Sequence, residues 1–430
     1  MKKFSGKKLL VLGSNVGSVD IVSYAKQNGA YTIVVDNLPP EKSPAKMIAD
    51  EHLMISTANT LELNLLIKNK NIDGIMAGIS EFNLIKAIEL CENNKKPFYC
   101  TLNQWNQIES KDNFRKLCIK NCVPVPKTFF IGKKLSKKVY ESIIYPVVVK
   151  PVDSSASLGV HICNNEEELI KFSEEALQIS NCHTIIIEEY VEGTEFTAHY
   201  TISNGTVSLS CVDNRYPIAV HEGTVTTVPI ARIYPCLYLD EYIQQVDPFM
   251  KRLCKELNLT NAILFIQGIY NKEKNRFYIF ESGLRCAGEA PYRFLNVING
   301  VNAMNMLVDH ALSEKINFDA QKEDPTLAGK CCGIVSFVAK GGVVGKIIGL
   351  EEAVNKTSSV IEYESRYPVG SVTPDGDTLR QLMIRFVMIC ENRDQMSKDI
   401  AFLNDNIKVL DEDGQNMVLK INPQRIHDIF

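Results

Sequence analysis

The chain has 430 residues, of which 45% are hydrophobic and 23% are charged, a balance typical of a globular protein with two or three domains. The formal net charge is −4, which predicts no nucleic-acid partner because phosphate binding needs a basic stripe. No apolar stretch reaches the length of a membrane span, and Leu9–Leu12 is too short for a signal-peptide core. The sequence therefore predicts a cytoplasmic protein that does not enter a membrane.

The 13 cysteines match neither paired zinc-binding CxxC motifs nor a small secreted disulfide framework. In a chain of this size we expect them to be reduced and mostly buried.

The N-terminal segment reads as strand, glycine turn, helix and strand. Leu9–Leu12 and Ile33–Val35 are the continuous apolar runs of parallel strands that are covered on both faces. Gly13, Gly17 and Asp36 imitate a dinucleotide fingerprint, but the GxGxxG pattern is not met. A Rossmann-type oxidoreductase therefore remains only a weak alternative.

Further strand and helix units are expected at 72–77, 81–92 and 98–101. Gly78–Glu81 falls between a strand and a helix, where α/β sheets bind ligands, but it also suits a capped helix start. An amphipathic helix is predicted over 108–122, with Phe114, Leu117, Cys118 and Cys122 on one face.

A lysine and a small-residue loop follow a predicted buried strand. Val147–Val149 delivers Lys150, and Pro151 ends the strand before the loop Asp153–Gly159. Small residues let backbone N–H groups approach a polyphosphate, while the ammonium acts as a point charge. The candidate phosphate-binding positions in the loop are Ser154, Ser155, Ser157 and Gly159.

Two carboxylates flank a tight bend further along the chain. A helix is expected over 164–180, because Asn165 and Glu168 form a capping-box pattern. A β-branched run then ends in Glu188, and Glu195 opens the strand that leads through Phe196–Ile202. The 164–180 helix and the strands at Lys150 and Glu188 together predict a small α+β lid.

A hairpin is predicted at 262–283. Ile263–Tyr270 and Arg276–Phe280 are antiparallel strands, which places Gln267 and Glu281 on neighbouring strands. Two oxygen ligands in this arrangement suit Mg²⁺, which takes its remaining ligands from phosphates and water. The alternative is a surface hairpin with an incidental glutamate.

Arg285 follows the hairpin in the sequence ESGLRCAG. A guanidinium near magnesium and a transferring phosphoryl group can hold substrate oxygens and neutralise developing charge. The alternative is a surface ion pair with Glu289. Polar groups that could face substrate occur upstream, at Asp213, Arg215, His221 and Glu222.

The C-terminal third is expected to be an α+β unit, after a helix over 239–257 that Pro248 interrupts. Its predicted elements are a hairpin over 331–350, strands at 359–364 and 407–410, and helices at 378–391 and 393–404.

The stretches YPVVVKPVDSSASLGV and IIIEEYVEGTEFTA, with the later hairpin, resemble the nucleotide-binding core of the ATP-grasp superfamily. The resemblance implies an α/β and α+β fold with a Rossmann-like domain, a central ATP-grasp domain with a lid, and a small C-terminal α+β domain. The expected boundaries are 1–110, 111–325 with the lid at about 126–190, and 326–430.

The resemblance also implies residue roles. Lys111, with Arg115 or Lys116 as the fallback, reaches the α-phosphate, and Lys150 reaches the β-phosphate. Glu188 accepts from the adenine amino group, backbone near Val191 contacts the ring, and Glu195 takes the ribose hydroxyls. The other family-matched positions are Tyr190 at the adenine, Gln267 and Glu281 at Mg²⁺, and Arg285 at the acyl phosphate.

Two details refine this set. Gln267 resembles the carbamoyl-phosphate synthetase branch, whereas many other members have an acidic residue there. Gly283 stands where many members have asparagine, which puts the second metal in doubt. The ESxxRxxG arrangement resembles peptide-forming amino-acid ligases.

The predicted activity is ATP-dependent ligation: a carboxylate becomes an acyl phosphate, and an amine captures it to give an amide, ADP and phosphate. The expected cofactors are ATP and Mg²⁺, for which Mn²⁺ can substitute, and the resemblance allows a homodimer. The alternatives are a bicarbonate-using carboxylase or carbamoyl-phosphate type of enzyme, and a nucleotide-binding protein without ligase activity.

Overall fold

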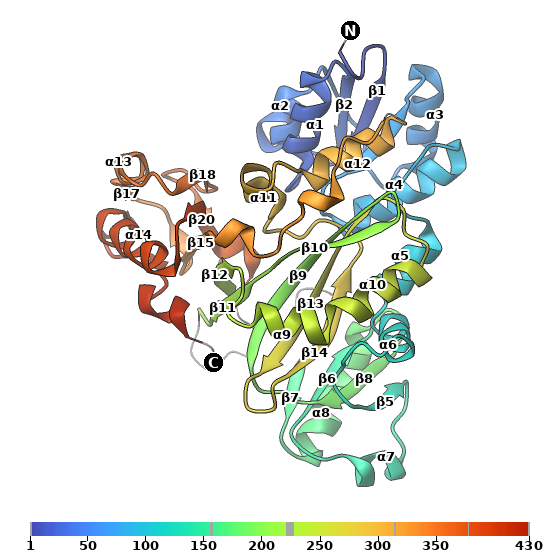
Figure 1. Ribbon diagram of the computed structural model, residues 1–430, viewed down its shortest axis with the longest axis vertical. Coiled ribbons are helices and arrows are strands. Elements are labelled where there is room, and N and C mark those ends of the chain that lie inside the picture. The colour runs from blue at the N-terminus through green and yellow to red at the C-terminus, as the bar shows by residue number, and fades with distance from the viewer. Residues whose placement is uncertain (1, 155–157, 221–227, 314, 377, 429–430) are drawn as a thin grey trace.

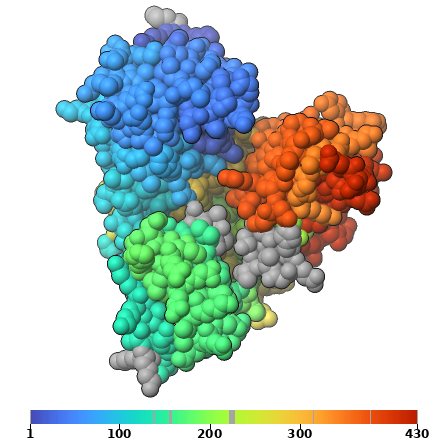
Figure 2. All heavy atoms as spheres, turned by 180° about the vertical axis from the view of Figure 1, so that it is seen from behind, coloured from blue at the N-terminus to red at the C-terminus, as the bar shows by residue number. Residues whose placement is uncertain are grey.

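The computed structural model describes residues 2–154, 158–220, 228–313, 315–376 and 378–428. Within these ranges, four main sheets with flanking helices form three lobes around the middle of the molecule (Figures 1 and 2). We refer to them as the N-terminal, small, central and C-terminal sheets. The α/β and α+β fold class predicted from the sequence is confirmed.

The N-terminal sheet is parallel, in the order β3-β2-β1-β4. Its strands are β1 (Lys8–Leu12), β2 (Tyr31–Asp36), β3 (Glu51–Met54) and β4 (Gly74–Ala77). Its helices are α1 (Ser18–Gln27), α2 (Pro44–Ile48), α3 (Thr60–Lys70) and α4 (Glu81–Asn94). Leu9–Leu12 and Ile33–Val35 are fully buried, as expected for parallel strands covered on both faces.

The small sheet is antiparallel, in the order β5-β8-β6-β7. Its elements are β5 (Thr128–Gly132), α7 (Lys137–Ser142), β6 (Val147–Pro151), β7 (His161–Cys163), α8 (Glu166–Ile179) and β8 (Ile185–Glu189). Val147, Val149, Leu169 and Ile187 belong to an apolar cluster separate from the other cores. The small sheet is therefore packed as a unit of its own, and its role as a lid remains a prediction.

The central sheet is also antiparallel, in the order β10-β9-β13-β14. Its strands are β9 (Thr194–Ser203), β10 (Thr206–Val212), β13 (Ala262–Asn271) and β14 (Arg276–Gly283). Helices α5 (Leu102–Glu109), α6 (Lys111–Lys120), α9 (Leu239–Gln245) and α10 (Asp247–Glu256) surround it. One apolar core runs from the N-terminal sheet into this layer, so these two sheets form a continuous body.

The C-terminal sheet runs in the order β11-β12-β15-β20-β18, and β22 also pairs with β15. Its strands are β11 (Asn214–Ile218), β12 (Val228–Tyr234), β15 (Cys331–Ala339), β18 (Val360–Ser365), β20 (Leu382–Cys390) and β22 (Val418–Leu419). The remaining elements are α11 (Tyr292–Ile298), α12 (Ala303–Ala311), α13 (Leu350–Lys356), α14 (Arg393–Asn406), β16 (Gly342–Val343), β17 (Lys346–Ile348), β19 (Val372–Thr373) and β21 (Lys408–Leu410).

The chain crosses between these layers more than once. β11 and β12 leave the middle of the sequence to join β15, and α12 returns to pack against α1 and β4 (Figure 1). The linear boundaries at 110 and 326 therefore remain a prediction.

Four predicted elements were wrong. Residues 382–390 form β20 instead of a helix, because an apolar run broken only by Arg385 suits a buried strand as well as a helix. The hairpin over 331–350 does not form, since β15 pairs with β12, β20 and β22. Residues 98–101 form no strand, and the 108–122 helix is divided at Ser110 into α5 and α6.

Other local predictions were confirmed. Ser80 caps α4 by accepting from the backbone N–H of Asn83, and Asn165 caps α8. All 13 cysteines are free, and all except Cys122 and Cys182 are buried, although Cys122 was expected on the buried face of its helix. In the described ranges no helix has the length and apolar character needed to cross a membrane.

Candidate active site

The candidate nucleotide site lies where β6 of the small sheet meets β14 of the central sheet. The Lys150 ammonium is 5.5 Å from the centre of the Phe280 ring, and Phe280 directly precedes Glu281. Lys111, the first residue of α6, lies between the two sheets. Its Nζ donates to the backbone carbonyl of Ser154 and is 3.6 Å from Glu281 Oε1. The structure thus brings two predicted phosphate ligands and one predicted metal ligand together.

Lys150 and Glu188 form a buried ion pair, and Arg115 pairs with the second carboxylate oxygen of Glu188. Arg115 also donates to the carbonyl of Pro126. Arg115, predicted as a fallback phosphate ligand, is therefore engaged with Glu188 and Pro126 in the structure. Burial lowers the pKa of Lys150, and the carboxylate of Glu188 only partly offsets this effect. A carboxylate has about four acceptor positions, so Glu188 can still accept from an adenine amino group.

The predicted metal pair is well placed for one cation. Gln267 and Glu281 are directly opposite each other on β13 and β14, at a bulge in the pairing. The Glu281 side chain is 35% exposed and its ion pair with Lys111 is long, at 3.6 Å, so its oxygens remain accessible to a cation. An amide oxygen and a carboxylate are hard donors that suit Mg²⁺. Among the described residues, no group of three or more His, Cys, Asp or Glu side chains forms a further metal site.

Gly283 has a packing reason to lack a side chain. A Cβ at this position would lie 2.3 Å from Phe265 Cε1, and the buried Phe265 ring lies 5.0 Å from the Arg285 guanidinium. A ligand side chain at 283 would therefore displace the ring beneath Arg285.

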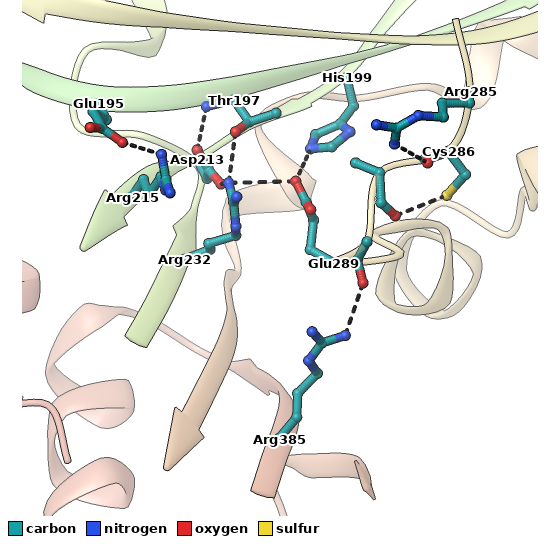
Figure 3. A network of polar contacts seen from close by, with 12 residues as sticks. Glu195, Thr197, His199, Asp213, Arg215, Arg232, Arg285, Cys286, Glu289 and Arg385 are labelled. Carbon is teal, nitrogen blue, oxygen red and sulfur yellow. Dashed lines mark hydrogen bonds and ion pairs between the residues drawn. The ribbon is translucent and has the colours of Figure 1, made fainter. Parts of the chain in front are cut away.

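The remaining predicted nucleotide contacts lie at the bend between β8 and β9. Tyr190 donates its backbone N–H to the carbonyl of Pro146, and Val191 is buried. Glu195 pairs with Arg215 of β11 (Figure 3). Gly159 has φ +72°, and a Cβ there would crowd Ile179 and Pro151. Ser155, Ser157, His221 and Glu222 lie outside the described residues.

Arg285 lies at the border with the N-terminal sheet. Its Nη2 is 2.8 Å from Glu81 Oε1, at the start of α4, so the predicted alternative of a pair with Glu289 is wrong. Burial lowers the pKa of Arg285, but the carboxylates of Glu109 and Glu81 raise it by more. Glu109 accepts from the backbone N–H of Leu284 at 2.7 Å. The guanidinium is thus held firmly protonated beside the strand that carries Glu281.

Glu109 makes the stability of the fold depend on pH. Burial raises its pKa from 4.5 to about 7, and the charge of Arg285 only partly opposes this. Because the folded pKa lies above the unfolded one, the native state binds more protons, and stability falls as pH rises between these values. Between pH 4.5 and 7, the free energy of unfolding of the wild-type chain should fall by roughly 3 kcal/mol because of Glu109. We expect this fall to be absent in Glu109→Gln, in which glutamine can still accept from Leu284. Urea unfolding of both proteins at pH 4.5 and 8 measures this, and equal pH dependence would contradict it.

The sequence reasoning missed a buried charge cluster behind Arg285, which Figure 3 shows. Arg232 of β12 pairs with Asp213 at 2.7 Å and lies 3.4 Å from Glu289, which is also 3.4 Å from His199 Nε2. Arg232 in the apolar run VPIARIY was an available signal, because a charge inside a buried strand requires a partner.

The alternative of a Rossmann-type oxidoreductase is disfavoured by the contacts of Asp36. Its Oδ1 accepts from the Leu38 N–H at 2.8 Å and lies 2.7 Å from Lys46 Nζ, and its Oδ2 accepts from Ser43. A carboxylate engaged on both oxygens is poorly placed to take a ribose hydroxyl, as a dinucleotide site would require.

Comparisons with known proteins agree with this geometry. A family model described as the D-ala D-ala ligase C-terminus matches residues 120–218. The large chain of carbamoyl phosphate synthase from Methanocorpusculum labreanum is 24% identical over 257 residues, which are 53% of this chain and 24% of that protein. The chain thus spans about a quarter of the length of this relative.

Solved structures share the fold over nearly the whole chain. The L-amino acid ligase from Bacillus licheniformis has a TM-score of 0.77 at 17% identity and covers 96% of this chain and 100% of its own. The biotin carboxylase domain of 2-oxoglutarate carboxylase from Hydrogenobacter thermophilus, solved with MgADP, ADP and bicarbonate, has a TM-score of 0.76 at 16% identity. It covers 98% of this chain and 94% of its own.

The family model, the relatives and the shared fold together support the resemblance to the ATP-grasp superfamily that the sequence predicted.

Proposed function

We propose that the chain is an ATP-dependent ligase that joins a carboxylic acid to an amine. The observation that supports this most strongly is the approach of Lys111, Lys150 and Glu281 to one another where the small sheet meets the central sheet. Two ammonium groups suit the α- and β-phosphates, and the Gln267–Glu281 pair suits Mg²⁺ at the γ-phosphate. When bound, Mg²⁺ would neutralise phosphate charge during transfer.

In the proposed reaction, a substrate carboxylate attacks the γ-phosphorus of ATP, and ADP leaves. The amine then attacks the carbonyl carbon of the acyl phosphate, loses a proton, and displaces phosphate to form the amide. Arg285, held charged by Glu81 and Glu109, stabilises the charge of the acyl phosphate. The small sheet with the 153–159 loop excludes water, because an exposed acyl phosphate hydrolyses.

The other nucleotide contacts remain part of the proposal. Glu188 and the backbone near Tyr190 and Val191 meet the adenine, while Glu195 meets the ribose. Ser154 and Gly159, with Ser155 and Ser157, approach the phosphates. We also propose that Mn²⁺ can replace Mg²⁺, since both prefer oxygen ligands, and that the protein acts in the cytoplasm, without a nucleic-acid partner, as a monomer or a homodimer.

The test is ADP release from the purified chain with ATP, Mg²⁺ and paired pools of carboxylic acids and amines. We expect turnover only when both partners are present, and mass spectrometry should detect an amide. Hydroxylamine in place of the amine should give a hydroxamate, which reports the acyl phosphate. ATP binding without ADP release under any condition would instead favour a nucleotide-binding protein.

A bicarbonate-using enzyme is the second candidate. Gln267 favours it, because the carbamoyl-phosphate synthetase branch has glutamine at this position, and that branch includes the relative matched above. Turnover that needs bicarbonate and no other acid would support this candidate over the amide ligase.

A further inference from the structure

The loop that carries Arg285, residues 284–290, is fixed at its front by the N-terminal half of the chain. Glu109 accepts from the backbone N–H of Leu284, and Glu81 pairs with Arg285. The Glu81 side chain is 40% exposed, so this front partner alone holds the guanidinium weakly.

The rear of the same loop is fixed by strands of two different sheets. The Glu289 carboxylate lies 3.4 Å from His199 Nε2 of β9 in the central sheet and 3.4 Å from Arg232 of β12 in the C-terminal sheet. Arg385 of β20 donates to the carbonyl of Gly288 at 2.9 Å (Figure 3). Glu289 thus ties the loop to both sheets at once.

These rear contacts of Glu289 are buried ion pairs, and in the described part of the chain neither Glu289 Oε1 nor His199 Nε2 has a hydrogen-bond partner. His199, Arg232 and Glu289 are 3%, 7% and 8% exposed. Burial alone would raise the pKa of Glu289, but Arg232 and His199 lower it by more, so the carboxylate is ionised. A buried ion pair in such surroundings is screened little by salt.

The position of Arg232 is also fixed by partners other than Glu289. It pairs with Asp213 at 2.7 Å and donates to Thr197 Oγ1 at 2.6 Å, and Asp213 in turn accepts from the Thr197 N–H. If Glu289 became neutral, Arg232 would keep these partners. The sheets would therefore remain joined, while the loop would keep only the Arg385 contact to the Gly288 carbonyl at its rear.

We propose that Glu289 is a positioning residue that acts through Arg285. This inference rests on the proposed ligase function, in which Arg285 stabilises the acyl phosphate. The two residues are four positions apart on one short loop, so a change at Glu289 moves the guanidinium. A displacement of about 1 Å in a positioned group can cost about 100-fold in rate.

The first test compares Glu289→Gln with a matched control, Glu323→Gln. Glu323 is a half-buried carboxylate that accepts from Ser210 on β10, and its hydrogen-bond partners Ser210, Thr201 and Asn299 lie outside the 284–290 loop. We expect Glu289→Gln to lower kcat for amide formation about 10- to 100-fold with the KM for ATP within twofold. The control should keep the wild-type kcat. Equal kcat values for Glu289→Gln and the wild type would overturn the proposal.

The second test separates positioning from a general loss of stability. In an Arg285→Lys background, Glu289→Gln should lower kcat by less than twofold, because the group through which it acts has already been changed. If Glu289→Gln instead lowered kcat by the same factor in the Arg285→Lys background as in the wild type, the proposal would be overturned.

A third measurement does not depend on turnover. Hydrogen exchange of the amides at 284–290 should accelerate in Glu289→Gln and stay at the wild-type rate in Glu323→Gln. If the wild-type chain fails to turn over ATP, the ligase proposal fails, while this exchange still reports whether Glu289 holds the loop. Unchanged exchange in Glu289→Gln would show that it does not.

Discussion

Replacing Glu281 with alanine is expected to lower ATP turnover at least about 100-fold, because the proposed metal pair then retains only the amide oxygen of Gln267. The lost carboxylate also faces Lys111, so the charge balance around the phosphates changes together with the metal site. ADP release should be measured over a wide range of Mg²⁺ concentrations. We expect raised Mg²⁺ to restore only part of the activity.

A matched control for this variant lies on the same hairpin. Glu273 is exposed in the turn between β13 and β14, far along the strands from Glu281. Glu273→Ala should retain wild-type turnover and Mg²⁺ dependence. Activity of Glu281→Ala within threefold of the control at equal Mg²⁺ would show that Glu281 is not a ligand in the reaction.

Replacing Lys150 with methionine is expected to weaken ATP binding by about 10- to 150-fold, the equivalent of roughly 1.5–3 kcal/mol for a charge-assisted hydrogen bond. Methionine keeps most of the aliphatic stem, and Glu188 keeps Arg115 as its buried partner. The variant should therefore fold. Isothermal titration with ATP and Mg²⁺ measures the effect.

Lys116→Met provides the comparison. This lysine is on the neighbouring helix α6, its side chain is 68% exposed, and it pairs with Asp112 at 3.1 Å. Its removal should leave ATP affinity unchanged. If Lys150→Met and Lys116→Met bind ATP equally well, Lys150 does not contact the phosphates.

The parts of the site that the sequence predicted are those set by local patterns. The β13–β14 hairpin follows from two apolar strands around a polar turn, and its pairing places Gln267 opposite Glu281. Likewise, a β-branched run ended by proline made Lys150 recognisable as the last side chain of a buried strand. Such features need only neighbours in the sequence.

The parts that the sequence did not predict depend on distant segments. Arg232 and Glu289 meet only because β12 joins the C-terminal sheet beside β15 while the 284–290 loop returns beneath it. The partners of Arg285, Glu81 and Glu109, come from elements near the N-terminal sheet. No local period or spacing encodes such contacts.

The error at 382–390 has a related cause. Apart from Arg385, LMIRFVMIC is apolar on both faces, so its pattern has neither the period of an amphipathic helix nor the alternation of a half-exposed strand. Its position in the middle of the C-terminal sheet, between β15 and β18, is what requires both faces to be buried.

A crystal structure with Mg²⁺ and a non-hydrolysable ATP analogue tests the central claim most directly. We predict one triphosphate between β6 and β14, with Lys111 and Lys150 at its oxygens and the metal at Gln267 and Glu281. A nucleotide bound elsewhere, or Lys150 and Glu281 facing separate cavities in that complex, would contradict the account.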